Sequence, residues 1–126
     1  MAPEEINKAV AERVMGAVWN DFREWWMFPA GDCWLANTFD PCHRIDHAWM
    51  VVEKMKDKYH WVIKSPFEKG DTYMAGLTPL GVTGWNGRPD FMAQADTAPM
   101  AICLASLAVL EAVPPAKSYD NEAVTL

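Results

Sequence analysis

The segment that decides the fold is DTAPMAICLASLAVLE, residues 96–111. It predicts a helix because Asp96 or Thr97 can accept hydrogen bonds from free backbone amides, and Pro99 needs no donor in the first helical turn. Apolar side chains surround most of this helix, and its middle part leaves only Ser106 polar. A helix with this pattern is buried on two sides, so it must pack against other elements of a folded domain.

The residues before this helix predict strands. Residues 59–64 alternate in hydrophobicity and predict one strand, and residues 72–75 predict a short second strand. Residues 82–85, followed by the turn pair Asn86-Gly87, favour one arm of a hairpin whose return arm contains residues 91–95. Tight turns between consecutive strands require an antiparallel or mixed sheet.

Two further helices are predicted nearer the N-terminus. Residues 3–15 repeat apolar side chains at four-residue spacing, and Gly16 suits the position just after a helix. Residues 40–55 predict a second helix, with Asp40 as its cap and Pro41 in its first turn. Residues 25–28 and 33–39 are typical of short extended stretches between these helices. The sequence therefore predicts an α/β domain of the α+β type, with three helices around a small sheet of three to five strands.

Length and composition indicate one domain. The chain has 126 residues and a mass of 14.2 kDa, which is enough for a core without disulfides or metals. We expect residues 1–113 to form this domain and residues 114–126, which begin with the helix-ending Pro114-Pro115, to form a loose C-terminal tail. The longest apolar stretch, residues 100–110, is about half the length needed to cross a bilayer, so no membrane span is expected.

Net charge and cysteine content indicate which partners and which cellular compartment to expect. The chain has 11 Lys and Arg residues against 17 Asp and Glu residues, a net charge of −6, which argues against binding to duplex nucleic acid. Three cysteines fit a reducing cytosol, and Glu4 and Glu5 stand where a signal peptide would be basic. Seven tryptophans and eight methionines are more than one small domain easily covers, so we expect a homo-dimer or a higher homo-oligomer.

Four residues can supply zinc ligands: Cys33, Cys42, His43 and His47. Thiolates and imidazoles suit zinc, and His43 and His47 lie one helical turn apart on a helix. The spacing, however, matches no common zinc finger, and free cysteines are often simply buried. We therefore expect no bound metal, and whether the four residues have any role stays open.

The sequence offers no catalytic set that stands above ordinary structural roles. Asp32, Asp40 and Asp46 can be considered as paired carboxylates, but each also suits a turn or a helix cap. Cys42 with His43 is the one local pair for nucleophilic catalysis, and adjacent residues on a helix do not face each other. We therefore expect a protein that is not an enzyme and needs no cofactor.

One segment has the residue types of a nucleotide site. Within Gly84–Pro89, Trp85 can stack on a base, Asn86 can bind its edge and Arg88 can pair with phosphate. The alternative interpretation is an Asn-Gly hairpin turn with no ligand. Because the net charge opposes an anionic ligand, further local cations are needed. Three more residues complete the candidate ligand-binding set: Arg44, Lys64 and Trp34.

Three separated segments resemble one family of proteins. Residues 11–16 (AERVMG), residues 39–55 with their AWMVVEKM ending, and residues 95–103 (ADTAPMAIC) are similar to the motifs of the phage ABA-sandwich domain family. The resemblance implies a phage or prophage origin and three layers, with helices on both faces of a small sheet. It implies little chemistry. Residues 41–44 (PCHR) depart from the small polar residues that the family has there.

These observations favour one function and leave an alternative open. The leading hypothesis is a phage accessory protein in the host cytoplasm that counters host defence by binding and sequestering a small, cyclic nucleotide signal without catalysis. The alternative is a protein that inhibits a host defence complex directly, as anti-CRISPR proteins do, through an exposed patch of Trp and Met. An enzyme is the third and least favoured class.

Overall fold

The computed structural model describes residues 2–35, 38–66, 68–80 and 91–112. Helix α1 (Pro3–Ala9) continues into a short π-helix, η1 (Val10–Val14), and the two other helices are α2 (Ile45–Met55) and α3 (Ala98–Ala112). The strands are β1 (Val18–Asn20), β2 (Trp25–Met27), β3 (Cys33–Leu35), β4 (Tyr59–Lys64), β5 (Tyr73–Pro79) and β6 (Phe91–Ala95).

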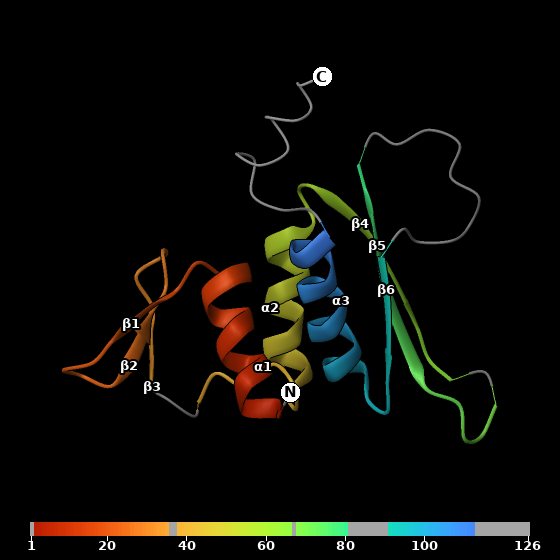
Figure 1. Cartoon of the computed structure of the whole chain (residues 1–126), viewed down its shortest axis with the longest axis horizontal. Helices are drawn as coiled ribbons and strands as arrows, with labels where there is room; N and C mark the ends of the chain where they lie inside the picture. The colour runs from red at the N-terminus through yellow and green to blue at the C-terminus, as the bar shows by residue number, and fades with distance from the viewer. Residues whose placement is uncertain (1, 36–37, 67, 81–90, 113–126) are drawn as a thin grey trace.

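The described strands form two separate antiparallel sheets, β1-β2-β3 and β4-β5-β6. The helices form the middle layer of the molecule, with the small first sheet on one side and the larger second sheet on the other (Figure 1). The predicted α+β class, with antiparallel pairing and three helices, is confirmed. The arrangement of layers differs from the expected one, because the helices lie between two sheets instead of on both faces of one.

Helix α3 holds the core together, as its all-round apolar sequence predicted. It packs on β5 and β6 on one side and on α2 and η1 on the other. Even its one polar residue in the middle, Ser106, is fully buried, and its hydroxyl donates a 2.7 Å hydrogen bond to the carbonyl of Cys103. At the start of the helix, Thr97 Oγ1 accepts a hydrogen bond from the Met100 amide at 3.4 Å, in agreement with its predicted capping role.

The N-terminal helix ends at Gly16 for a conformational reason. Gly16 has φ of +74°, a left-handed conformation that glycine adopts without the steric cost of a Cβ. The turn lets the Ala17 amide donate to the Ala11 carbonyl at 2.8 Å, while the Met15 amide donates to the Val10 carbonyl at 3.0 Å. The second bond spans five residues and defines the π turn, so the predicted helix end is confirmed with one unexpected feature.

The second helix begins later than predicted. Residues 40–44 form a turn in which the Asp40 carbonyl accepts hydrogen bonds from the His43 and Arg44 amides, and α2 starts at Ile45. Asp40 therefore begins a turn and does not cap α2. The reason is that the Asp40 side chain bonds to α1 instead, through Asn7, as described below.

The register of the small sheet sorts its side chains into two faces. Trp19, Trp26 and Trp34 are direct neighbours across the three strands, and this row faces the helices. The neighbouring positions, such as Val18 and Met27, point to the opposite side because side chains alternate along a strand. The small sheet thus attaches to the domain through a row of tryptophans.

The larger sheet follows the alternation that the sequence predicted. Trp61, Leu77 and Phe91 are neighbours across β4, β5 and β6 and pack toward the core. Strand β5 is longer than the predicted residues 72–75. The predicted hairpin arm at residues 82–85 and the predicted tail at residues 114–126 lie outside the described residues. In the described part of the chain, no helix is long and apolar enough to cross a membrane.

Candidate functional site

A groove of about 730 Å³ runs between α1–η1 and the helix-facing side of the small sheet. We call it the aromatic groove. Its aromatic wall contains Trp19 and Trp26, whose ring centroids are 5.1 Å apart in an edge-to-face arrangement. Its helical wall presents Glu4, Lys8 and Glu12, which repeat every four residues and therefore share one side of the helix. The groove thus combines an aromatic surface with charged side chains.

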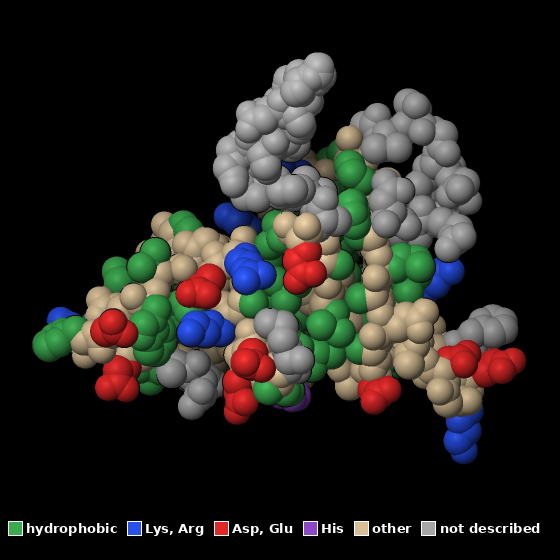
Figure 2. Space-filling view, viewed as in Figure 1, with side chains coloured by type: hydrophobic (Ala, Val, Ile, Leu, Met, Phe, Trp, Pro, Cys, Tyr) green, Lys and Arg blue, Asp and Glu red, His purple; other side chains and the backbone are tan. Residues whose placement is uncertain are grey.

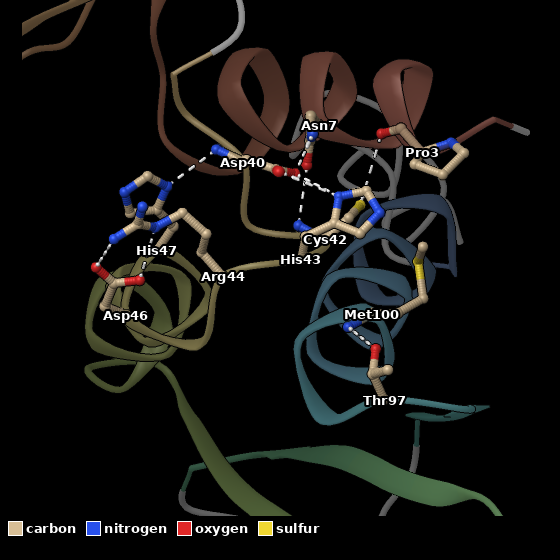
Figure 3. Close-up of polar contacts among 10 residues, drawn as sticks. All are labelled: Pro3, Asn7, Asp40, Cys42, His43, Arg44, Asp46, His47, Thr97 and Met100. Atoms are coloured by element: carbon tan, nitrogen blue, oxygen red, sulfur yellow. Dashed lines mark hydrogen bonds and ion pairs between the residues drawn. The ribbon is translucent and has the colours of Figure 1, made fainter.

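One end of the aromatic groove is a hydrogen-bonded turn centred on Asp40 (Figure 3). Asn7 of α1 donates from Nδ2 to Asp40 Oδ1 at 2.8 Å, and its own Oδ1 accepts the Cys42 amide at 3.0 Å. His43 Nδ1 lies 2.9 Å from Asp40 Oδ1. Burial raises the pKa of Asp40, but the hydrogen bonds from Asn7 and His43 outweigh it, so the net pKa is lowered and the carboxylate stays charged.

The Asp40 backbone also fixes the ring of His47 on α2. The Asp40 amide donates to His47 Nδ1 at 2.9 Å, so this nitrogen is an acceptor and the proton of the neutral ring is on Nε2. The His47 ring stacks on Phe39 at 5.7 Å and meets Trp34 edge-on at 5.0 Å. Burial lowers the pKa of His47, which favours the neutral ring.

A second, smaller pocket of about 530 Å³ lies on the other side of Asp40, and it brings together two predicted ligand-binding residues. Trp34 and Arg44 both line it, together with His47. The Arg44 guanidinium makes two hydrogen bonds to the Asp46 carboxylate, at 3.1 and 3.0 Å. The paired guanidinium lowers the pKa of Asp46 to about 2. A ligand phosphate would therefore compete with Asp46 for Arg44.

The other predicted ligand-binding residues are not part of these pockets. Lys64 is exposed at the end of β4 in the larger sheet and lines neither pocket. Trp85, Asn86 and Arg88 lie outside the described residues. The predicted set of six therefore reduces to Trp34 and Arg44 as neighbours in the described structure, with Lys64 elsewhere.

The candidate zinc ligands have separate environments. Cys33 is exposed on β3, whereas Cys42 is buried and its thiol donates to the Pro3 carbonyl at 3.6 Å. His43 is next to Asp40, while His47 is directed to the Asp40 amide. Within residues 2–35, 38–66, 68–80 and 91–112, no three His, Cys, Asp or Glu side chains are grouped so that they could hold a metal ion. The expectation that the protein binds no zinc stays a prediction.

The outer side of the small sheet is a second candidate site, and the sequence analysis did not locate it. We call it the exposed face and define it by five side chains: Val18, Phe22, Trp25, Met27 and Leu35. Four of these are 65%, 88%, 43% and 57% exposed, in the order Val18, Phe22, Met27 and Leu35. The signal was present in Trp25-Trp26-Met27, because a strand that is apolar at consecutive positions places apolar side chains on both sides of its sheet.

A cation and several carboxylates surround the exposed face. The guanidinium of Arg23 lies 5.4 Å from the ring centroid of Trp25 and 5.9 Å from that of Phe22. Asp21, Glu24 and Asp32 are exposed in the turns at the ends of these strands. Figure 2 shows apolar side chains reaching the surface at this end of the molecule, interspersed with acidic ones. The exposed face is therefore an apolar patch with a mainly acidic border.

Comparison with known proteins identifies the family. The model of the phage ABA sandwich domain matches residues 8–107, so the chain belongs to this family of phage proteins. A phage protein from Bacillus cereus ATCC 14579, known from a 2.0 Å crystal structure, is similar at 29% sequence identity with a TM-score of 0.60. The match covers 86% of this chain and 91% of that one. A comparison with curated proteins gives no match.

Proposed function

We propose that this phage protein counters host defence by binding another protein through the exposed face of its small sheet, in the host cytoplasm and without catalysis. The observation that supports this function is the group of exposed apolar side chains in neighbouring register positions, with Met27 between Val18 and Cys33. Soluble chains rarely expose apolar patches of this kind unless the patch has a partner. Phe22 at the strand turn is the most exposed of them and is suited to enter a pocket.

The border of the exposed face indicates the chemistry of the partner. Asp21, Glu24 and Asp32 outnumber Arg23, so a partner with an apolar centre and basic residues around it would be complementary. Trp25 and Met27 add an aromatic anchor and an adaptable side chain, both of which are enriched in interface cores. No reacting group is needed for such a function, because occupying the surface of a defence protein is sufficient to block it.

Two methionines with nearly equal exposure allow a matched test. Met27 in the exposed face is 43% exposed, and Met92 on the larger sheet is 41% exposed. We expect Met27→Lys to lower phage plating at least tenfold on a host whose defence the wild-type protein overcomes, because a buried lysine opposes the interface. Met92→Lys should leave plating unchanged. Equal plating of both variants, with both proteins folded, would contradict the proposal.

Sequestration of a small cyclic nucleotide is the second candidate. The smaller pocket favours it in one respect, since Trp34 and Arg44 lie together there. The Trp34 indole N–H is buried and has no acceptor in the described part of the chain, so an acceptor atom on a ligand would satisfy it. Two carboxylates disfavour a phosphate here: Asp46, which is hydrogen-bonded to Arg44, and Asp40, which lines the pocket. For this reason protein binding is the leading proposal.

Thermal shift measurements separate the two functions. A nucleotide ligand would raise the melting temperature of the wild-type protein in a concentration-dependent way. The shift in melting temperature should be lost in Arg44→Ala and retained in Met27→Lys, because Arg44 lines the smaller pocket and Met27 does not. The absence of any shift with cyclic dinucleotides and ADP-ribose-type signals would count against this candidate and favour protein binding.

A further inference from the structure

We infer that the aromatic groove binds an extended basic peptide segment with two arginine or lysine side chains four residues apart. The groove lies on the helix-facing side of the small sheet, opposite the exposed face, so this site is independent of the proposed function. Its wall of Trp19 and Trp26 and its carboxylates are the features from which we argue.

The charges along the helical wall are not neutralised by neighbours. Glu4, Lys8 and Glu12 are exposed, and no described residue lies within ion-pair distance of any of them. Glu5, next in the chain, differs because its carboxylate accepts the Ala2 amide at 2.8 Å. The two free carboxylates on the groove side can therefore pair with a ligand at no cost to an existing ion pair.

The opposite wall selects for cations. Guanidinium and ammonium groups bind favourably over tryptophan rings, and Trp19 is only partly buried, so its ring remains accessible to the groove. The Asp40 carboxylate, already hydrogen-bonded to Asn7 and His43, is a third acidic group at the end of the groove. Although Lys8 and His43 also line the groove, its aromatic rings and three carboxylates favour a basic side chain over a phosphate.

Spacing favours a peptide over a single small cation. Glu4 and Glu12 are eight residues apart, about 12 Å along the helix at 1.5 Å per residue. In an extended peptide, residues i and i+4 point to the same side and lie about 13 Å apart. Two basic side chains at this spacing match the two carboxylates, and Lys8 between them matches a neutral or acidic residue at i+2. Glu12 lies in the π turn η1, a feature that is frequent at functional sites.

The probe is a nine-residue synthetic peptide with blocked ends, arginine at positions 3 and 7, and aspartate at position 5. Binding is measured by calorimetry and by the change in tryptophan fluorescence. We expect saturable binding that weakens at high salt, because exposed charge pairs are screened. The double variant Glu4→Gln/Glu12→Gln should bind at least tenfold more weakly. Glu68→Gln/Glu111→Gln, which removes the same charge outside the groove, is the matched control and should bind as wild type.

Several results would overturn the inference. Equal weakening in both double variants would mean that the peptide responds only to net charge. Equal binding of a peptide with glutamines at positions 3 and 7 would mean that basic side chains are not recognised. Saturable binding of a cyclic dinucleotide that Glu12→Gln strengthens would assign the groove to an anion. Met27→Lys should leave peptide binding unchanged, so failure here and failure of the proposed function are distinguishable.

Discussion

Asp40 connects three parts of the chain through the atoms of a single residue. Its carboxylate is hydrogen-bonded to the side chains of Asn7 in α1 and of His43 in its own turn. Its backbone amide donates a hydrogen bond to the ring of His47 in α2. Both pockets reach this residue. The position of the aromatic groove relative to the helices thus depends on a few polar contacts, in a region that is otherwise held by apolar packing.

His47 gives the protein a pH-dependent stability. Burial lowers its pKa, with Arg44 acting in the same direction and Asp46 and Asp40 opposing, so the unfolded chain binds a proton more readily than the folded one. The contribution of the neutral His47 ring to the free energy of unfolding is fully present above the ordinary histidine pKa of 6.5 and is lost as the pH falls below it. We expect the melting temperature to be lower at pH 5.5 than at pH 7.5.

The control for this prediction is a comparison of the wild type with a variant that lacks the His47 ring. His47→Gln should show a smaller fall in melting temperature between pH 7.5 and pH 5.5 than the wild type, because the titrating group is gone. A fall of the same size in His47→Gln and in the wild type would show that another group causes it.

Among the elements, α3 packs against α1, η1, α2, β5 and β6, so a disturbance of its packing should lower the free energy of unfolding strongly. Leu107 is 5% exposed in this helix, and a carboxylate at this position would be buried without a partner. We expect Leu107→Asp to lower the free energy of unfolding by about 3 to 5 kcal/mol, measured by urea denaturation. Leu80→Asp, at an exposed position after β5, should change it by less than about 0.5 kcal/mol. Near wild-type stability of Leu107→Asp would contradict the assigned burial.

The elements also show what a sequence can and cannot predict here. The ends of α3 and the turn at Gly16 depend on neighbouring residues, so capping and periodicity located them. Strands of three residues, such as β1, are too short to show an alternating pattern, and the separate small sheet was therefore missed. The exposed face lies on this sheet, and its signal in the sequence was the run of consecutive apolar residues 25–27.

The candidate site depends on contacts that are distant in sequence. Asn7 bonds to Asp40 and Cys42 across more than thirty residues, and no local pattern indicates these partners. Because the Asp40 side chain is engaged in this way, a residue typical of a helix cap begins a turn instead. The proximity of Trp34 and Arg44, which the candidate set contained, also became visible only with the fold.

For the whole molecule, the exposed face predicts self-association of the free protein. When its partner protein is absent, this apolar patch is available to a second copy of the chain. Pairing across a two-fold axis would bury the patch of both copies. We expect multi-angle light scattering to give a dimer, and Leu35→Lys to give a monomer. Ile63→Lys, on the larger sheet, should remain dimeric. A strict monomer at high concentration would exclude the predicted homo-oligomer.

The contact between η1 and α3 has a consequence for synthesis on the ribosome. Val10, Ala11 and Val14 of η1 are buried and η1 packs on α3, so this early apolar segment meets α3 only when nearly all of the described chain has been translated. At bacterial elongation rates this delay is about 5 to 20 seconds. During that interval α3 cannot cover the apolar side of the nascent N-terminal helix, so we expect this segment to bind chaperones that recognise emerging chains.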